Sequence, residues 1–511
     1  MSAAIKSIIV GAIGLILAVI LGSQLGHGSW FVPASITGGC VLFATYIVFF
    51  RAVRLEALIL GFLIFGYIVG NRGFAQISIS EHPPLYLGEA GMLACLAGLS
   101  FNFALKRDKP LPKSALCWAV LAFIAIGAFR LYFDLILHLN LAEPKVILRD
   151  SATVYYALFF FIAFKLGRNP IARQVIERCV LIGCILLIPV FLIQFFVAPD
   201  LFYHITFRGY PVILHKGDLT TTYLAFASFF FFLRPARGLL RVVFRVLALV
   251  FFAGMLALMA RAALFGFAVA AVLLLIARRP QFIFYQAVVG CLVLIVVGVL
   301  HVAQFDRSSG FLARLTDRVE SMTDVSGTHS YRGSIGDYSS DNNQFRLIWW
   351  RAVIDETMQK GPWFGLGFGH DLASTFVREY YGNQYSAIFD TRSPHSIWIT
   401  VVGRMGLLGL LSFFFVVFFI FRDAMRATRL VARHRQPQDT LVLWSGVVIL
   451  LGAASVGVVL EGPMGGILFW SFLGIASSQL QQYELKESIE KTKEDSPKIS
   501  RATRPRALAG V

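Results

Sequence analysis

A histidine about three-quarters of the way along the chain is the side chain best placed for acid–base chemistry. His395 lies in the segment Arg392-Ser393-Pro394-His395-Ser396-Ile397-Trp398, where a polar stretch meets an apolar run that begins at residue 396. The proton affinity of histidine lies near neutral pH, and a helix that starts here would hold the imidazole in place for proton transfer. The same pattern also fits a histidine that only caps the helix at the membrane surface. His395 is our candidate for a catalytic base.

Charged residues also lie where hydropathy alone would place leucine, within or at the outer ends of the apolar runs. Each costs on the order of 3 kcal/mol unless it is paired or hydrated. As a set they either pair with one another to fix helix packing or line a polar cavity that opens outward. Arg261, between two apolar runs, can meet an anion carried by a lipid, although an arginine that merely extends to the interface has the same signature. The six residues are Glu89, Arg130, Asp150, Arg261, Arg404 and Glu461.

The elements that must position these residues are membrane-spanning helices. Of the 511 residues, 57% are hydrophobic and only 15% are charged, whereas about a quarter of the residues in a soluble protein are charged. The apolar residues fall into runs of roughly 17 to 25, long enough to cross a hydrocarbon core as a helix and unlike the alternating pattern of a barrel strand. The net charge of +17 comes from short basic clusters between these runs, which indicates membrane orientation and no nucleic-acid partner.

The apolar windows predict an all-α polytopic membrane protein of about 12-14 transmembrane helices. The six cysteines lie in or beside apolar runs and form no C-x-x-C pair, so the sequence predicts no disulfide framework and no metal site. Individual helices are expected near 5-22, 33-50, 55-70, 86-104, 114-135, 150-166, 178-197, 217-233, 241-258, 262-277, 281-301, 396-421, 440-459 and 464-480.

Basic residues between the apolar runs predict the orientation. Loops that would be cytoplasmic with the amino terminus inside carry clusters of lysine and arginine, and the opposite short loops hold only scattered ones, so the positive-inside rule is satisfied. Both termini are therefore expected in the cytoplasm. The clusters are Arg51 and Arg54; Lys106, Arg107, Lys109 and Lys113; Lys165, Arg168 and Arg173; Arg234, Arg237 and Arg241; Arg278 and Arg279; and Arg422, Arg426, Arg429, Arg433 and Arg435.

These features divide the chain into four expected parts. Residues 1-302 form an N-terminal transmembrane helical bundle, and 303-395 form one large extracytoplasmic loop. Residues 396-480 form the C-terminal transmembrane helices, and 481-511, rich in Lys, Glu, Ser and Pro, form a disordered cytoplasmic tail. Within the loop, apolar residues at helical spacing from 344 to 358 predict a short amphipathic helix at the membrane surface.

Four sequence elements, in the same order, resemble those of the O-antigen ligase and polysaccharide polymerase family. The segment from His395 through Arg404 to Gly406-Leu-Leu-Gly409 is similar to its signature, in which a histidine begins a helix that later carries Gly-Leu-x-Gly. Phe345-Arg346-Leu-Ile-Trp349-Trp-Arg-Ala-Val resembles its Arg-x-x-x-Trp element, and Gly361-Pro362-Trp-Phe-Gly365-Leu-Gly367-Phe-Gly369 resembles its Pro-leu-phe-Gly-x-Gly element. Ala260-Arg261-Ala-Ala-Leu-Phe-Gly resembles its Ser-Arg-Gly-Ala-Leu element. The resemblance is close over about 200 to 410 and extends to earlier spans only in topology.

The chain departs from that family pattern at three positions. Ser396 replaces the asparagine that usually follows the histidine, and Ala260 replaces the serine before the arginine. Arg404 stands where a carboxylate is common, which reverses the charge inside the membrane. This reversal indicates either a subfamily with a different acceptor or the loss of a partner that orients His395.

The resemblance implies a GT-C-like, metal-independent, inverting glycosyltransferase of the bacterial inner (cytoplasmic) membrane, without a cofactor, acting on the periplasmic side. Its donor would be an undecaprenyl-diphosphate-linked glycan, and its acceptor a glycan, lipid A-core or protein. With no metal motif, arginine forks must stabilise the departing diphosphate. We expect Arg261 and Arg208 on the diphosphate, with Arg346 as a third candidate, and His395 as the base or as the group that orients the acceptor hydroxyl.

Two alternatives remain open at this point. A ligase joins finished glycan to lipid A-core or protein, whereas a polymerase joins one repeat to another. The Arg149-Asp150-Ser151-Ala152 element and the altered signature favour a secreted-polysaccharide polymerase. A transporter or flippase of lipid-linked oligosaccharide would also use many helices and buried charges. Against it, the sequence shows no internal repeat, no paired broken helices and one very asymmetric loop.

Overall fold

A computed structural model gives the structure of residues 54–81, 84–104, 114–136, 143–258, 260–303, 334–376, 393–434 and 439–495. Within these ranges the chain is almost entirely helical, and its strands form two short antiparallel hairpins. The hairpins pair β1 (Ser78–Glu81) with β2 (Pro84–Tyr86) and β3 (Thr206–Phe207) with β4 (Tyr210–Pro211). The protein is an all-α polytopic membrane protein, as the sequence predicts.

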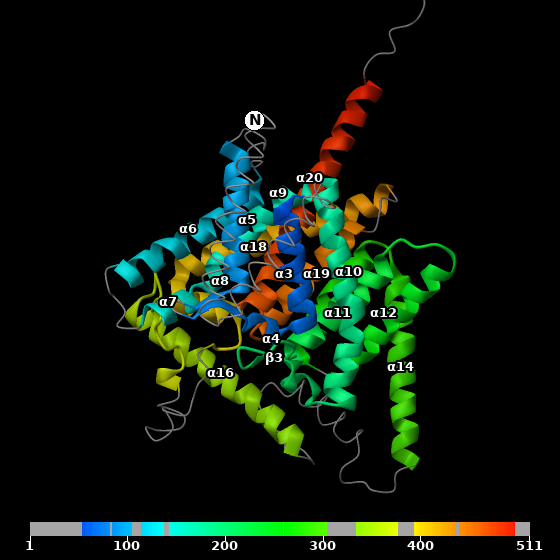
Figure 1. Cartoon of the computed structure of the whole chain (residues 1–511), viewed down its shortest axis with the longest axis horizontal. Helices are drawn as coiled ribbons and strands as arrows, with labels where there is room; N and C mark the ends of the chain where they lie inside the picture. Colours follow the sequence, from blue (N-terminus) through cyan, green and yellow to red (C-terminus); the bar gives the residue numbers. More distant parts are fainter. Residues whose placement is uncertain are drawn as a thin grey trace, which may run out of the picture.

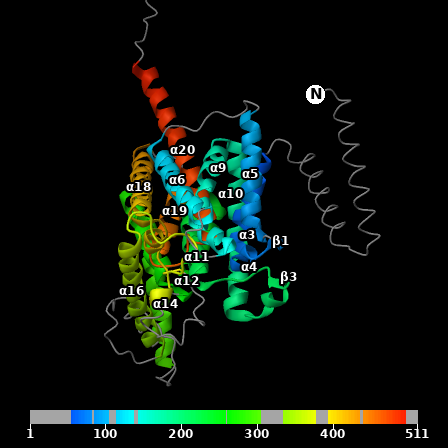
Figure 2. The ribbon, with the colours of Figure 1, turned by 90° about the vertical axis from the view of Figure 1, so that its left-hand side faces the viewer.

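The long helices form a bundle in which many packed neighbours are far apart in the sequence (Figures 1 and 2). Helix α9 packs against α20, α3 against α10, α13 against α19 and α6 against α18. Helix α16 extends across one end of the bundle in Figure 1. The helices are α3 (Leu55–Gly70), α4 (Arg72–Ala75), α5 (Leu87–Ala104), α6 (Ala115–Ile136), α7 (Pro144–Asp150), α8 (Ala152–Tyr155), α9 (Leu158–Gly167), α10 (Pro170–Leu192), α11 (Gly217–Leu233), α12 (Gly238–Leu258), α13 (Arg261–Ile276), α14 (Pro280–Ala303), α16 (Ser334–Lys360), α18 (Ile397–His434), α19 (Asp439–Ser455) and α20 (Pro463–Asp495). Short π and 3-10 segments follow α10 at Ile193–Val197 and Leu201–His204.

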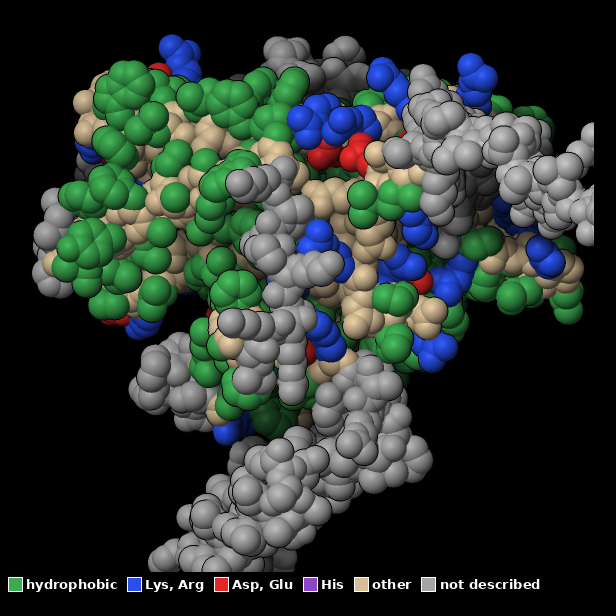
Figure 3. All heavy atoms as spheres, turned by 90° about the horizontal axis from the view of Figure 1, so that it is seen from above, with side chains coloured by type: hydrophobic (Ala, Val, Ile, Leu, Met, Phe, Trp, Pro, Cys, Tyr) green, Lys and Arg blue, Asp and Glu red, His purple; other side chains and the backbone are tan. Residues whose placement is uncertain are grey.

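Several of these helices are long and apolar enough to cross a membrane. In the described part of the chain there are five, or six if the bent pair Pro144–Asp150 and Ala152–Gly167 forms one span. Shorter apolar helices, among them α3, α11 and α13, complete the bundle. Seen from the end towards which α20 extends, most visible charged side chains are lysine and arginine, set among apolar side chains (Figure 3).

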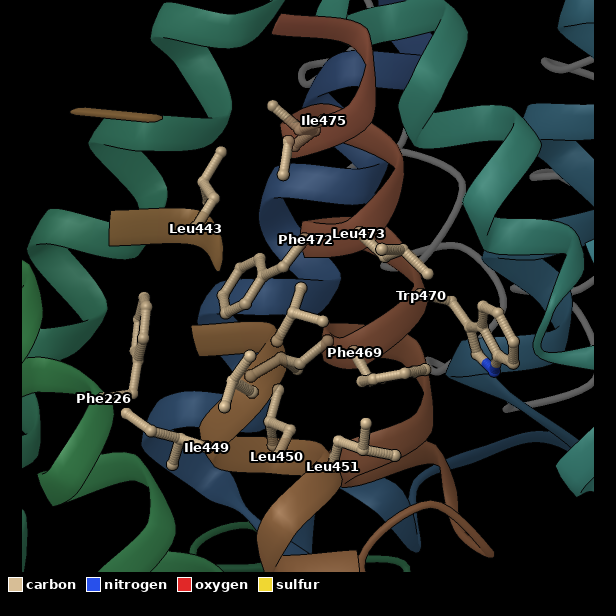
Figure 4. Close-up of a cluster of buried hydrophobic side chains, with 14 of the residues drawn as sticks. Phe226, Leu443, Ile449, Leu450, Leu451, Phe469, Trp470, Phe472, Leu473 and Ile475 are labelled. Carbon is tan, nitrogen blue, oxygen red and sulfur yellow. The ribbon is translucent and has the colours of Figure 1, made fainter. Parts of the chain in front are cut away.

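The centre of the bundle is formed by α11, α19 and α20. Every residue of α11 from Leu219 to Leu233 is buried, because this helix is apolar on all sides and has neighbours on all sides. Phe226 of α11 packs against Phe472 of α20 with ring centroids 4.9 Å apart, beside Ile449 and Leu450 of α19 (Figure 4). These contacts fix α11, α19 and α20 relative to one another. Polar residues lie at the start of α11 and in the turn between α19 and α20.

Helix α18 is broken at Gly406, where φ is 64° and ψ is −159°. The loop after α16 fits into this break: Leu366 N–H donates to Gly403 O, and the N–H groups of Leu407 and Leu408 donate to Pro362 O and Trp363 O. Backbone groups that the break would leave unpaired therefore have partners. The glycine-rich element that follows α16 and the glycine-rich part of α18 form one backbone junction.

The structure agrees with most expected windows and differs at three places. The expected helix over 150-166 is the bent pair α7 and α8–α9, with an angle of 43°, and α18 has its break, so the expectation of no paired broken helices was wrong. Helix α20 continues to Asp495, so residues 481–495 are helical where a disordered tail was expected. The expected helices over 5-22 and 33-50, and residues 496–511, lie outside the described residues.

Candidate functional site

His395 occupies a tight turn just before α18. Its φ is +57°, a left-handed conformation that costs a non-glycine residue on the order of 1–3 kcal/mol and is common at functional sites. Two tryptophans of α16 hold this turn: Trp350 Nε1–H donates to Pro394 O at 2.5 Å, and the Trp349 ring lies edge-on to the imidazole at 5.9 Å between centroids. The position of His395 therefore depends on α16 as well as on α18.

The imidazole of His395 is half-buried and neutral at neutral pH. Burial lowers the pKa of His395 to about 4, and the positive charges of Arg346 and Lys216 lower it in the same direction, against the opposing effect of Asp218. Its Nδ1 is buried and has no hydrogen-bond partner among the residues that the structure describes. A neutral imidazole always carries one acceptor nitrogen, so the ring can receive a hydrogen bond from a hydroxyl group.

Charged groups from two other elements act electrostatically on this imidazole. Arg346 projects from α16 and donates from Nη1 to Val456 O at 2.8 Å, in the turn that follows α19. Lys216 and Asp218 lie at the start of α11, where Lys216 is the residue before the first helical turn. The site therefore combines the interior of α16, the start of α11, the turn after α19 and the turn before α18, which are distant in sequence.

Glu461, in the turn between α19 and α20, also stabilises the turn that contains His395, through Ser393 and Thr400. It accepts a hydrogen bond from Thr400 Oγ1 at 2.7 Å and one from the Ser393 side chain. Ser393 Oγ in turn accepts from His395 N at 3.3 Å. Burial raises the pKa of Glu461, while these hydrogen bonds and the charges of Arg404 and Lys216 oppose that rise.

The structure brings two of the three expected arginines close to the same turn. Arg261 is the first residue of α13, and a Cβ at Gly457 would lie 3.3 Å from the Cβ of the next residue, Ala262. Gly457 directly follows Val456, which accepts the hydrogen bond from Arg346. The start of α13, where Arg261 lies, and Arg346 are thus both close to the turn after α19.

Arg208 belongs to a different part of the molecule. It is exposed at the tip of the β3–β4 hairpin, its guanidinium lies 5.7 Å from the centroid of the Phe207 ring, and its Nη1 donates to the carbonyls of Ser78 and Ile79 at 3.4 and 3.5 Å. These contacts join the two hairpins. A role for Arg208 on the diphosphate stays a prediction, without a described contact that links it to His395.

Sequence analysis missed Lys216 and Asp218. The only signal was a lysine and an aspartate on either side of Gly217, directly before the apolar run of 217–233. An acidic residue in the first turn of a helix is common, since it interacts favourably with the helix dipole, so nothing marked the pair as functional.

Arg404 forms a second charged cluster with Asp150. Arg404 is 4% exposed; its Nη2 lies 2.8 Å from Asp150 Oδ2, and its Nη1 donates to Gly367 O and His370 O. Asp150 also accepts from Gly369 N at 3.2 Å. The reversed charge at position 404 therefore has its counter-charge on α7, and the pair attaches the loop after α16 to both broken helices.

Residues 246–414 match the sequence model of a family described as O-antigen ligase. This stretch, about a third of the chain, is similar to the O-antigen ligase family. The search of curated proteins found no match. The matched residues include Arg261, Arg346, His395 and the glycine-rich junction, whereas Arg208, Lys216 and Asp218 precede them. In the described residues, no group of three or more His, Cys, Asp or Glu side chains is arranged to hold a metal ion.

Proposed function

We propose that the protein is an inner-membrane glycosyltransferase that transfers or polymerises a glycan from an undecaprenyl-diphosphate-linked donor on the periplasmic side. The observation that carries this proposal is the neutral, half-buried His395 ring, whose Nδ1 has no partner among the described residues, with Arg346 and Lys216 close enough to lower its pKa. A base beside cations is what attack by a hydroxyl on a phosphate-activated sugar requires. The similarity of residues 246–414 to the O-antigen ligase family supports the same class of reaction.

The proposed step is a single displacement. The acceptor hydroxyl donates its hydrogen bond to the unprotonated ring nitrogen of the half-buried His395, and its oxygen attacks the anomeric carbon of the donor glycan. A new carbon–oxygen bond forms as the bond to the diphosphate breaks, and the electron pair of that bond leaves with undecaprenyl diphosphate. The hydroxyl proton moves to His395 and is then released to water. Attack opposite the leaving group inverts the anomeric centre.

The cations have the second role, which is to bind the diphosphate whose negative charge increases as the bond breaks. Guanidinium groups suit this role because they donate two parallel hydrogen bonds to phosphate oxygens. Arg346, which donates to Val456 in the turn after α19, and Arg261, at the start of α13 next to the same turn, are the proposed pair, with Lys216 as an additional point charge. Because these side chains supply the positive charge, the proposed mechanism is metal-independent.

Donor binding would also adjust the base. The charges of Arg346 and Lys216 depress the pKa of His395, and a bound diphosphate would offset those charges. The pKa of His395 would therefore rise when the donor is present, which increases its ability to accept a proton. The imidazole would be a weak base in the empty site and a stronger one in the loaded site.

The acceptor would be a glycan repeat for a polymerase, or lipid A-core or protein for a ligase. The Asp150 element no longer favours the polymerase. Asp150 pairs with Arg404 and Arg149 lies 3.6 Å from Asp150, so the element holds helices together. Transport of lipid-linked oligosaccharide is the competing class, since broken helices occur at transporter binding sites. Here the polar groups at the two breaks bind each other.

The test uses purified full-length protein with a lipid-linked donor. Donor binding and product formation are measured for the wild type, for His395→Ala and for His204→Ala, a matched control because His204 is exposed and lies outside the cluster. We expect His395→Ala to bind donor but to form product about 100- to 10,000-fold more slowly, with the control unchanged. Unaltered turnover in His395→Ala would refute the role of this residue, and wild-type protein that moves glycan without forming a glycosidic bond would indicate a transporter.

A further inference from the structure

A pocket distinct from the His395 cluster lies where α16 ends. Its volume is about 430 Å³, and the turn Gly361–Leu366 forms one wall while Arg130 of α6 and His370 contribute to the others. Arg404 connects the two regions, because it donates to the carbonyl of His370 and its charge affects Glu461. Lys360, the last residue of α16, also lines the pocket.

The polar lining of this pocket is cationic. Arg130 donates from Nε and Nη2 to Asp134 at 3.1 and 2.9 Å, and Lys360 Nζ lies 2.7 Å from Glu356. Neither carboxylate lines the pocket, and both are buried behind their cations. The buried carboxylates therefore fix the positions of the two cations, while the cations themselves line the pocket, an arrangement that suits an anion-binding site.

Each carboxylate also serves groups outside the pocket. Asp134 accepts a hydrogen bond from Phe368 N at 2.7 Å, and Glu356 accepts one from Thr375 Oγ1 at 2.8 Å. Both carboxylates stay charged and balance the two cations. The ion pair with Asp134 uses only two of the five N–H donors of the Arg130 guanidinium, and Lys360 Nζ has three N–H donors, so both cations can donate hydrogen bonds to a phosphate in the pocket.

The opposite wall is aromatic and exposed. Trp363 is 61% exposed and Phe364 is 42% exposed, and the Phe364 ring lies 5.6 Å from that of Phe129 on α6. Arg130 lies six residues before the end of α6, which is on the order of 9 Å along the helix axis. Tryptophan beside basic residues at the end of a membrane-spanning helix is typical of the headgroup layer, where lipid phosphates lie.

We propose that this pocket binds the phosphate headgroup of a second lipid, and that this lipid is the acceptor of the transfer reaction; the acceptor role rests on the proposed function. The cations would bind the phosphate and the aromatic wall would contact the adjacent apolar part. Lys360 follows Trp349, the neighbour of His395, by eleven residues, on the order of 16 Å along α16. One helix would thus hold the donor at one point and the acceptor lipid at another.

The test measures lipid retention by the full-length protein in nanodiscs of zwitterionic phosphatidylcholine. The probes are undecaprenyl phosphate and diphosphoryl lipid A, which represent substrate lipids, and phosphatidylglycerol, which represents the bilayer. Lys360→Gln removes a side chain that is 62% exposed, so the fold should persist, and Arg130→Lys keeps the charge that pairs with Asp134. The matched control is Arg351→Gln, which removes an exposed i,i+4 ion pair with Asp355 from the same helix.

We expect Lys360→Gln to weaken retention of a substrate-class probe about tenfold, with phosphatidylglycerol retention and the Arg351→Gln control unchanged. In transfer assays, Lys360→Gln should raise the KM for a lipid acceptor without changing the KM for the donor. Equal retention of both substrate-class probes by wild type and Lys360→Gln would refute the site. Loss confined to phosphatidylglycerol would make this a bilayer-lipid site and refute the acceptor role. Lipid retention stays measurable if transfer is absent, so failure of the proposed function and failure of the pocket give different results.

Discussion

The His395 cluster and the Arg404 cluster differ in how completely their polar groups are paired. Arg404 bonds to a carboxylate and two carbonyls, and its partner Asp150 also accepts a backbone N–H. His395, in contrast, has a strained backbone and a buried nitrogen with no partner in the described part of the chain. Saturated bonding stabilises a fold, whereas an unpaired group costs free energy that a substrate can recover. We therefore interpret Arg404 as a structural residue and keep His395 as the proposed catalytic residue.

The largest expected effect would come from breaking the ion pair between Arg404 and Asp150. Arg404→Leu leaves Asp150 buried without its counter-charge, which should lower the free energy of unfolding by about 3–5 kcal/mol. The double variant Asp150→Leu, Arg404→Leu removes both charges and should recover much of that loss. Thermal unfolding in detergent would measure both variants. If Arg404→Leu is as stable as wild type but inactive, Arg404 acts in the chemistry and the comparison fails.

A smaller effect, on activity alone, should follow from Arg261→Lys. The lysine keeps the charge but cannot form the two parallel hydrogen bonds of a guanidinium, so transfer should fall by about a hundredfold at normal expression. Arg237→Lys is the matched control and should have little effect, because Arg237 is exposed in the turn between α11 and α12 and has no role in the proposed mechanism. Full glycan output from Arg261→Lys would show that Arg261 only anchors the helix.

The pH dependence tests the depressed pKa of His395. The neutral imidazole is the active form, so activity falls as the pH decreases through its pKa. Because that pKa is about 4 in the empty site, kcat/KM should be constant from pH 7 to about 5 and fall below that. The acid limb of kcat should lie at higher pH, since bound diphosphate offsets Arg346 and Lys216. Coincident limbs would contradict donor-dependent adjustment of the base.

The smallest effect is expected from Asp218→Asn. The Asp218 carboxylate raises the pKa of His395 against the effect of its cationic neighbours, so its removal should move the acid limb of kcat/KM by roughly half a pH unit toward lower pH. Turnover at neutral pH should fall only a few-fold. The thermal unfolding temperature should stay near that of wild type. A large decrease would instead show that Asp218 stabilises the fold, as Asp150 and Arg404 are proposed to do.

Hydropathy predicted helix positions well because a membrane selects on composition. The expected window 217-233 coincides with α11 (Gly217–Leu233). The breaks were not predicted, since the sequence around Gly406 stays apolar and backbone angles leave no trace in hydropathy. In the site, His395 and Arg346 were found through family-like elements. Lys216 was not, because its proximity to His395 depends on how α11 packs against helices far away in the sequence.

The junction between Gly365 and Gly406 has a consequence for how this protein can evolve. A Cβ on Gly365 would lie 2.5 Å from the Arg404 backbone, and one on Gly406 would lie 2.5 Å from Gly365 N. Each obstacle is main chain, which no change of side chain can remove. No second substitution at the other glycine could therefore compensate for a side chain at the first. We expect both positions to remain glycine in proteins that keep this junction.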